Sequence, residues 1–336
     1  RQRQMCIRDS FFIGVFVGAD YPIATSLIAE FTPKEHRSIS MGMVSAAWYL
    51  GATVAAVVGY GLYGMEDGWK WMLGSAVAPC VVLLIGRHDI PESPLWLASK
   101  GRVAEARAVM DRGFGPDVEL APAKPAGKTP LATLMHGEYL KRMVFLGVFI
   151  LCQVVPMYAI YTFGPEIMTA FGLGEGHEAI LGESAVSLFF LVGSIPAMFW
   201  LNSMGRRPLL LMSFALMAVG LLVLGLWPTA PVAMIILAFG LYAFFSGGPG
   251  ILQWLYPNEL FPTEVRATAV GIAIGFSRIG TIAATYGTPL ALTAWGVGPV
   301  MLVAAGLVLL GLVLSYFMAP ETRGKSLAET SGIDDR

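Results

Sequence analysis

Asp20 is an ionisable side chain inside an apolar stretch of the chain, where a charge is costly. It is the one charged residue of residues 11–29, which are numerous enough to cross a bilayer. A carboxylate near the membrane centre costs roughly 2.5–3.5 kcal/mol on insertion scales, so we expect Asp20 to face a cavity or a partner. Burial would favour its protonated form and allow proton exchange. The alternative is a hydrogen bond between helices.

Arg278 is a second ionisable side chain inside an apolar run, in the sequence G-I-A-I-G-F-S-R-I-G-T-I. It lies about twelve residues, or ~18 Å, from the start of the run at 267–292, which is too deep for easy snorkelling. A guanidinium in a cavity of low dielectric constant binds a carboxylate or phosphate through two parallel hydrogen bonds. The alternative is an internal ion pair, with Asp20 as a candidate partner.

Nine apolar runs supply the helices that must position these side chains. Of the 336 residues, 56% are hydrophobic and 13% are charged, against about 25% charged in soluble proteins. Length and composition predict an all-α membrane protein that crosses the bilayer many times. The net charge of −1 gives no reason to expect a nucleic-acid partner. The runs lie near 11–30, 41–63, 71–86, 143–164, 184–201, 208–227, 231–255, 267–292 and 298–318.

Lysine and arginine gather in alternate connections between these runs. Nine basic residues lie within 87–142, whereas none lies within 165–183. Basic loops stay in the cytoplasm, so we expect 87–142 to be cytoplasmic. Within it, residues 95–113 alternate apolar and basic residues at helical spacing and are expected to lie along the membrane surface. Residues 115–130, rich in Pro, Ala, Gly and Lys, indicate a flexible linker.

Six segments resemble the major facilitator superfamily, within its sugar-porter and metabolite:proton symporter branches. Together they span nearly the whole chain in the family's order, and the closest likeness is to bacterial inner-membrane metabolite transporters. The segments are Gly18-Ala-Asp-Tyr-Pro22, Glu30-x-x-Pro33-x-x-x-Arg37, Pro91-Glu-Ser-Pro-Leu-Trp-Leu97, Asn202-x-x-Gly-Arg-Arg-Pro208, Asn258-Glu-Leu-Phe-Pro-Thr-x-x-Arg266 and Pro320-Glu-Thr-Arg-Gly324.

The resemblance implies a bundle of twelve helices in two halves, of which this chain would hold helices four to twelve. We therefore expect an N-terminally truncated transporter. Residues 1–10, without the apolar core of a signal peptide, would be an atypical and possibly foreign head. The remaining parts would be a partial N-terminal bundle at 11–90, a cytoplasmic loop at 91–142, a six-helix bundle at 143–320 and a tail at 321–336.

The resemblance also assigns residues to a substrate and proton site. It implies proton coupling or substrate contact for Asp20, and Arg278 matches the S-R-x-G pattern of organic-anion carriers. Gln153 is expected to hydrogen-bond a hydroxylated substrate, although the family's Leu-Ser-Gly after it is absent here. Gly247-Gly-Pro-Gly250 is expected to break its helix beside the cavity. Tyr21, Tyr158 and Trp254 would either contact substrate or pack.

A third set of residues would gate the transporter from the cytoplasmic side. Charges at helix ends are ordinarily solvated and stabilise by under about 1 kcal/mol per pair. The resemblance implies salt bridges that close the inside while the cavity faces outward, with Glu30 and Arg37 pairing across the repeats with Glu259 and Arg266. Leu95 replaces an arginine of the family's P-E-S-P-R, so one bridge is expected to be missing. The gating charges are Glu30, Arg37, Glu92, Arg206, Arg207, Glu259, Arg266 and Glu321.

These observations predict a secondary transporter, a proton-coupled symporter of an organic anion or sugar acid, in a bacterial inner membrane. A neutral sugar or polyol transporter is the first alternative, and a non-transporting membrane sensor is the second. No Ser-His-Asp set, phosphate loop or metal cluster marks an enzyme. We expect no cofactor or metal beyond the proton gradient, and the expected partners are a small-molecule substrate and the lipid bilayer, with the protein acting as a monomer.

Overall fold

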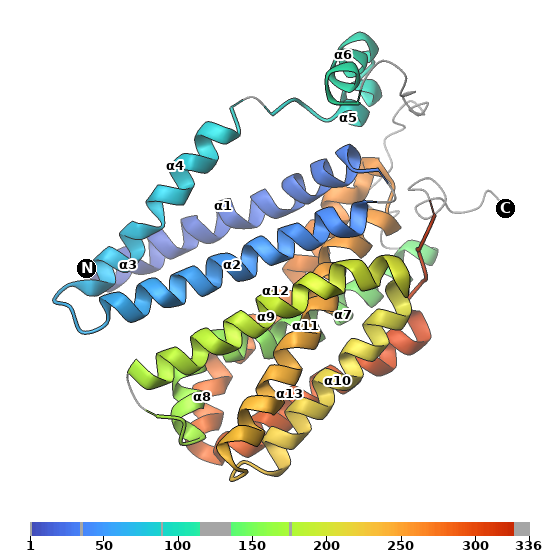
Figure 1. Cartoon of the computed structure of the whole chain (residues 1–336). Helices are drawn as coiled ribbons and strands as arrows, with labels where there is room; N and C mark the ends of the chain where they lie inside the picture. Colours follow the sequence, from blue (N-terminus) through green and yellow to red (C-terminus); the bar gives the residue numbers. More distant parts are fainter. Residues whose placement is uncertain (1, 34–35, 89, 115–135, 175–176, 326–336) are drawn as a thin grey trace.

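The computed structural model describes residues 2–33, 36–88, 90–114, 136–174 and 177–325 (Figure 1). These residues form a bundle of helices, which confirms the predicted all-α class. The helices are α1 (Gln2–Phe31), α2 (Arg37–Leu62), α3 (Gly68–Ser75), α4 (Val77–Gly86), α5 (Pro94–Ser99), α6 (Val103–Phe114), α7 (Gly137–Thr162), α8 (Gly164–Ala170), α9 (His177–Ser203), α10 (Arg206–Leu226), α11 (Val232–Leu260), α12 (Thr263–Trp295) and α13 (Val297–Met318).

Within the described ranges, nine segments are long and apolar enough to cross a membrane, and they coincide with the nine predicted runs. The third segment, Gly68–Gly86, consists of α3 and α4, which meet around Ala76. Residues 2–10, expected as a separate head, are helical and continue into the first span as part of α1. The helices predicted along 95–113 are α5 and α6, whereas the predicted linker at 115–130 lies outside the described residues.

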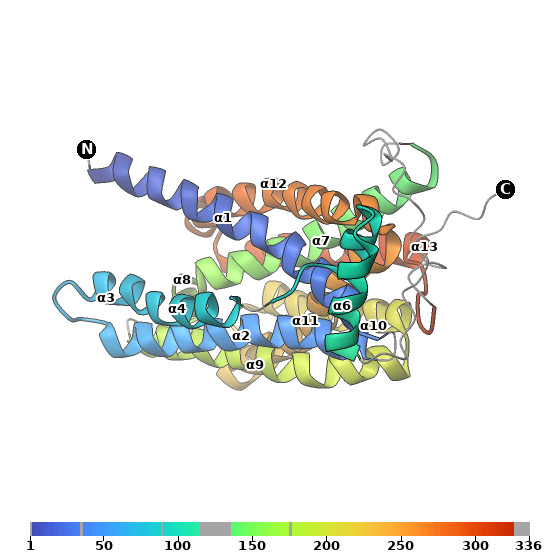
Figure 2. The ribbon, with the colours of Figure 1, turned by 90° about the horizontal axis from the view of Figure 1, so that it is seen from above.

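The helices from α7 onward form the buried core of the protein. The span in α7 is 72% buried, and α10 packs against both α11 and α13, while α11 also packs against α9. The first two helices lie on this core, with α1 along α12 and α2 along α9 (Figures 1 and 2). Two separate helix sets therefore meet in the middle, and the interface between them is the place for a central site.

Large apolar side chains cover the outer faces of several spans. Phe16 of α1, Leu84 of α4 and Phe317 of α13 are each at least 72% exposed. Such surfaces are costly in water and ordinary in lipid, where only the backbone must satisfy its hydrogen bonds internally. The exposed apolar surface thus agrees with a chain that lies in a bilayer.

The prediction that Gly247-Gly-Pro-Gly250 breaks its helix is wrong, because α11 runs unbroken from Val232 to Leu260. The glycines instead allow helices to approach closely. A Cβ on Gly247 would lie 2.7 Å from the backbone of Gly193 in α9, and one on Gly250 would lie 2.6 Å from the Tyr49 hydroxyl in α2. Membrane helices use small residues in this way, since packing rather than water drives their association.

Candidate functional site

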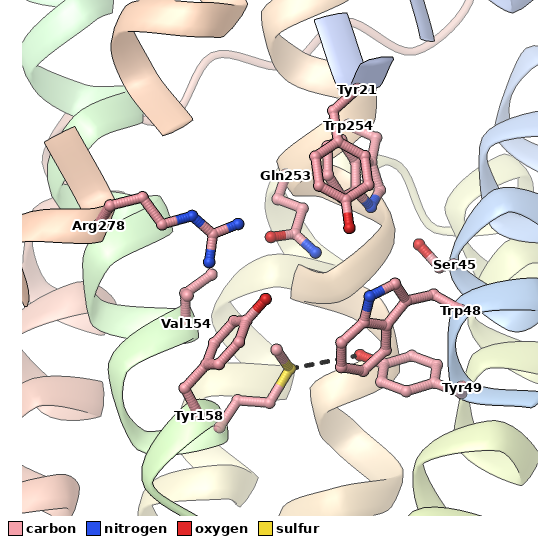
Figure 3. Close-up of a pocket in the computed structure, with 10 residues that line it drawn as sticks. Tyr21, Ser45, Trp48, Tyr49, Val154, Tyr158, Gln253, Trp254 and Arg278 are labelled. Atoms are coloured by element: carbon pink, nitrogen blue, oxygen red, sulfur yellow. Dashed lines mark hydrogen bonds between the residues drawn. The ribbon is translucent and has the colours of Figure 1, made fainter. Parts of the chain in front are cut away.

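A small central pocket lies where α1 and α2 meet α7, α11 and α12 (Figure 3). Its volume is about 20 Å³, which is room for roughly one water molecule. In this structure the site is therefore closed around its own side chains. The lining residues are Tyr21, Ser45, Trp48, Tyr49, Val154, Met157, Tyr158, Gln253, Trp254 and Arg278.

Helical periodicity positions most of this lining. Ser45, Trp48 and Tyr49 are spaced i, i+3 and i+4 on α2, so they share one face. Val154 and Tyr158 have the same relation on α7. The lining residues of each of these two helices therefore lie on one face of the helix, within one or two turns. The polar groups of the two helix sets converge at the pocket.

Arg278 is placed as the sequence predicted, midway along α12 and on the pocket. Its guanidinium lies over the ring of Tyr158, with 5.1 Å between the guanidinium carbon and the ring centroid, and points toward the pocket centre in Figure 3. Among the residues that the structure describes, no carboxylate lies within 4 Å of it. The alternative of an ion pair with Asp20 is not realised here.

Asp20 differs from the expectation of a buried carboxylate facing the cavity. Its side chain is 44% exposed and makes two hydrogen bonds with Arg87, the residue that follows α4, at 2.6 and 3.0 Å. The pKa of Arg87 is raised, first by this hydrogen bond and then by the carboxylate's charge. The neighbouring Tyr21 points into the pocket instead, because consecutive residues of a helix face directions about 100° apart.

Aromatic rings form much of the pocket wall. Tyr21 and Trp254, on α1 and α11, lie with ring centroids 5.1 Å apart, so they connect the two helix sets directly. Trp48 makes edge contacts with Tyr158 at 6.4 Å and with Tyr161 at 5.4 Å. The three predicted aromatic residues therefore lie together at the site, and their packing contacts are compatible with either of the roles considered from sequence.

Gln153 is fully buried one turn before Met157 and lies behind the pocket lining rather than in it. Its amide nitrogen faces the Ser246 hydroxyl at 3.5 Å and the Met157 sulfur at 3.7 Å. Its amide oxygen has no hydrogen-bond partner within the described structure. The predicted contact with a hydroxylated substrate thus requires Met157 to move.

Sequence reasoning missed six lining residues: Ser45, Trp48, Tyr49, Val154, Met157 and Gln253. Two signals could have found some of them. The spacing of Ser45, Trp48 and Tyr49 marks one helix face within a run of small residues, and Gln253 is a polar residue next to Trp254 in an apolar span. Nothing in the sequence distinguishes Met157 from an ordinary apolar residue of a membrane helix.

Buried ion pairs join the two helix sets at the end of the bundle that carries α5, α6 and the last turn of α13. Glu30 of α1 faces Arg266 of α12 at 3.8 Å, and Arg37 of α2 faces Glu259 of α11 at 3.7 Å. Arg206 of α10 also pairs with Glu259, at 3.2 Å. These five side chains, the charged cluster, are at most 6% exposed and form the cross-repeat pairs expected from sequence.

Glu321 and Arg207 support the edge of the charged cluster. The Glu321 carboxylate accepts hydrogen bonds from the backbone N–H groups of Arg206 and Arg207 at 3.1 and 3.0 Å, where anions are favoured at the N-terminus of α10. The next residue, Thr322, donates to Glu259 at 2.5 Å. Arg207 itself reaches out to the carbonyl of Tyr316 at 2.7 Å.

Glu92 does not join the charged cluster. It is exposed, and the nearby Ser93 makes the contact to the cluster instead, by donating a hydrogen bond to the Glu30 carboxylate. Ser93 also caps α5 by accepting from the backbone N–H of Trp96 at 3.0 Å. The segment before α5 is therefore held by a serine, and the grouping of Glu92 with the gating charges is not matched by its position.

The chain resembles known transport proteins over almost its whole length. The model of the family described as "Sugar (and other) transporter" matches residues 3–333. YaaU of Escherichia coli K12 is 51% identical over 96% of this chain and 73% of its own length. The inner membrane metabolite transport protein YgcS of the same organism is 33% identical over 96% of this chain and 72% of its own.

A solved structure shares the fold. The major facilitator superfamily proton:xylose symporter XylE of E. coli, bound to 6-bromo-6-deoxy-D-glucose, superposes with a TM-score of 0.78. The match has 23% sequence identity and covers 91% of this chain and 69% of the other. The arrangement of helices is thus that of the XylE fold, which agrees with the nine spans found in the described residues.

Proposed function

Because the chain belongs to the sugar (and other) transporter family of the major facilitator superfamily, we propose that it is a proton-coupled transporter of small hydroxylated organic anions such as sugar acids. It is a multi-pass membrane protein and a transporter rather than an enzyme, and the similarity to YgcS supports an inner-membrane location. One observation carries the choice of substrate: Arg278 lies on the pocket without a carboxylate partner in the part of the chain that is described.

A guanidinium at this depth favours an anionic substrate. A charge in an apolar span is costly unless it is paired, and arginine stays protonated at every physiological pH. Contact with the Tyr158 ring compensates only part of this cost, since a desolvated cation–π contact is worth about 2 kcal/mol. A carboxylate that enters the pocket would supply two charge-assisted hydrogen bonds and remove the remaining penalty.

Polar side chains around Arg278 favour hydroxyl groups on that anion. Ser45 and Gln253 approach from opposite helix sets and both donate to the carbonyl of Gly250, at 2.9 and 3.1 Å. The hydroxyls of Tyr21 and Tyr158 also line the pocket. Donors and acceptors spaced around an aromatic wall are the usual means of binding a polyhydroxylated molecule.

Arg278→Gln is expected to weaken binding of gluconate, a hydroxylated carboxylate, by roughly 10–100-fold, because a hydrogen-bonded charge partner is lost. Arg278→Lys keeps the charge without the bidentate geometry, so its affinity for gluconate should lie between those of the wild type and Arg278→Gln. Initial uptake rates of labelled gluconate into proteoliposomes measure the effect, with labelled xylose as the neutral comparison. Gluconate uptake that is unchanged in Arg278→Gln would exclude the anion site.

Transport of a neutral sugar or polyol is the second candidate. The aromatic wall formed by Tyr21, Trp48 and Trp254 suits stacking against a sugar ring, and the XylE symporter shares the fold. In that case Arg278 would serve packing against Tyr158 alone. Xylose uptake that exceeds gluconate uptake and tolerates Arg278→Gln would favour this candidate, and no uptake of any solute would favour a sensor.

Asp20 is the proposed proton site, and its pairing with Arg87 suggests how a proton could act. Protonation would remove the carboxylate charge and release Arg87. The contact between α1 and the end of α4 would then be present while Asp20 is ionised and absent while it is protonated. Asp20→Asn mimics the protonated state. We expect it to abolish accumulation driven by the proton gradient while exchange of substrate down its own gradient persists.

Uptake with and without a protonophore tests this role of Asp20. Asp67→Asn is the matched control, because Asp67 forms a similarly exposed pair with Lys70, at 2.9 Å, in the connection between α2 and α3. Its uptake should remain sensitive to the protonophore. If Asp20→Asn still accumulates substrate in a protonophore-sensitive manner, the coupling proton binds elsewhere.

The charged cluster is the proposed gate on the cytoplasmic side. It joins the helix sets that alternating access must separate, and its pairs are buried while the pocket has room for about one water molecule. Opening this end would require Glu30–Arg266 and Arg37–Glu259 to separate. All residues assigned to pocket and gate belong to one chain, so we propose that a monomer is sufficient.

A further inference from the structure

Four polar or sulfur-bearing side chains gather at the pocket wall, where Tyr49 and Met157 line the pocket and Gln153 and Ser246 lie behind them. Tyr49 of α2, Gln153 and Met157 of α7 and Ser246 of α11 are each at most 3% exposed. The Tyr49 hydroxyl is hydrogen-bonded to Ser246, and the Gln153 amide faces the same hydroxyl at 3.5 Å. We call these four residues the inner cluster.

The sulfur of Met157 accepts the strong donors of the inner cluster. The Tyr49 hydroxyl lies 4.0 Å from it, which is the dashed contact in Figure 3, and the Gln153 amide nitrogen lies 3.7 Å from it. A thioether is a weak acceptor. A hydroxyl or carbonyl oxygen would be a stronger acceptor than this sulfur. Although both donors also face Ser246, part of their hydrogen-bonding energy is therefore unrealised.

The inner cluster also holds surplus hydrogen-bonding groups. The Gln153 amide oxygen has no partner in the described part of the chain. If the amide were rotated by 180°, its nitrogen would be the atom without a partner instead. Tyr242 lies one turn before Ser246 on α11, is fully buried, and its hydroxyl is likewise without a partner there. Buried polar groups without a protein partner are rare in folded proteins, so these atoms are candidates to hydrogen-bond a bound molecule.

Met157 is the wall between the inner cluster and the pocket. It lines the pocket on one side and contacts Tyr49 and Gln153 on the other. Methionine has three rotatable bonds and a polarisable tip, so it can swing aside with little loss of packing. Movement of this one side chain would connect the pocket to Tyr49, Gln153 and Ser246 without moving a helix.

We propose that Met157 is a displaceable plug over a second substrate subsite formed by Tyr49, Gln153 and Ser246, and that a substrate hydroxyl group takes the place of its sulfur. This rests on the proposed function, since it extends the same binding pocket. A hydroxyl fits the subsite because it both accepts and donates: its oxygen accepts from Tyr49 or the Gln153 amide N–H, and its proton goes to the unpaired amide oxygen. A substrate would then be held by Arg278 at its anionic end and by this subsite at a hydroxylated end.

Calorimetric titration of the purified full-length protein with gluconate and with hexanoate tests the subsite. Both probes are six-carbon carboxylates, and they differ in their hydroxyl groups. Met157→Ala removes the plug, so gluconate should bind about 3–10-fold more tightly while hexanoate binding stays within about twofold. Tyr49→Phe removes one donor and should weaken gluconate binding about 10-fold without changing hexanoate binding.

Matched variants separate the plug from general loosening of α7. Met143→Ala truncates another buried methionine of the same helix, away from the pocket, and should leave the ratio of the two affinities unchanged. Met157→Leu keeps the side-chain volume but has no acceptor, so it should also tighten gluconate binding. It replaces Met157→Ala in the experiment if that variant does not fold. Affinity ratios within twofold of the wild type in both a Met157 variant and Tyr49→Phe would overturn the proposal.

A third probe distinguishes failure of this inference from failure of the proposed function. If Arg278→Gln leaves gluconate binding unchanged, the anion proposal fails, and the subsite is then judged with glucose. Tighter glucose binding in Met157→Ala and weaker binding in Tyr49→Phe would still support the plug. Wild-type protein that binds neither gluconate nor glucose would overturn both proposals.

Discussion

Replacing Glu259 by glutamine is expected to open the end of the bundle proposed to face the cytoplasm, because its carboxylate pairs with two buried guanidinium groups. Arg37 and Arg206 lie 3.7 and 3.2 Å from it and are at most 5% exposed. Removing one partner of a buried ion pair leaves an uncompensated charge and costs about 3–5 kcal/mol. A shift of that size between the closed and open states would reduce uptake by roughly 100-fold or more.

Two measurements check the Glu259→Gln variant. Initial uptake rates give the loss of transport, and labelling of a cysteine introduced at Ser38 with a membrane-impermeant thiol reagent gives the degree of opening. Ser38 suits this purpose because it is fully buried beside Arg37 at the start of α2. The reagent should reach the cysteine from the cytoplasmic side in the variant and react slowly in the wild type.

Glu138→Gln provides the matched control for the charged cluster. Glu138 pairs with Lys141 at 3.4 Å on the first turn of α7, at the same end of the bundle, but the two side chains are 51% and 73% exposed. Exposed pairs contribute about 0–1 kcal/mol, so uptake and labelling should stay close to wild type. If Glu259→Gln behaved like this control, the charged cluster would have no part in closing the inside.

Gly193→Ala is expected to have the largest effect on folding. A Cβ at Gly193 in α9 would lie 2.0 Å from the carbonyl oxygen of Phe244 in α11, which is a backbone atom that no side-chain rotation can move. The two helices would have to separate along one of the main contacts of the core. We expect a cost of about 3 kcal/mol or more, which lies at the upper end for overpacking.

Thermal unfolding in detergent measures this effect, together with the yield of monodisperse protein. The melting temperature of Gly193→Ala should fall by about 5–10 °C. Gly271→Ala is the control, because no atom lies within 4 Å of a Cβ at that position of α12 and alanine favours a helix. Equal melting temperatures for the two variants would show that α9 and α11 do not need this close approach.

The class of the protein and the number and order of its spans in the described chain could be predicted from the amino-acid sequence alone. Hydrophobic length suffices for this, because a helix must bury its backbone polar groups over the thickness of the bilayer. The sequence also identified Arg278 as a candidate site residue, since a charge at that depth is costly wherever its helix packs. The pairing of Glu30 and Arg37 with Glu259 and Arg266 was implied by the resemblance to the family.

Which side chains meet across helices depends on how the helices pack, and the sequence did not predict it. The pair between Asp20 and Arg87 was not predicted, although both residues are evident in the sequence. Glu259 pairs with Arg206 as well as with Arg37. Ser93, and not the predicted gating charge Glu92, contacts Glu30. Sequence spacing gives the face of one helix on which a residue lies. It does not give the rotation of that helix against a neighbour far away in the chain, which close packing at residues such as Gly193 decides.

The pocket lining shows the same limit most clearly. In a soluble helix the apolar stripe marks the face that packs inward, but a membrane span is apolar all round, because lipid and protein interior are equally apolar. Periodicity therefore could not distinguish Met157, which lines the pocket, from an apolar residue that faces lipid. The sequence predicted that an arginine and several aromatic residues act in a central site, and the packing of α2, α7 and α11 decided that Ser45, Tyr49 and Met157 complete it.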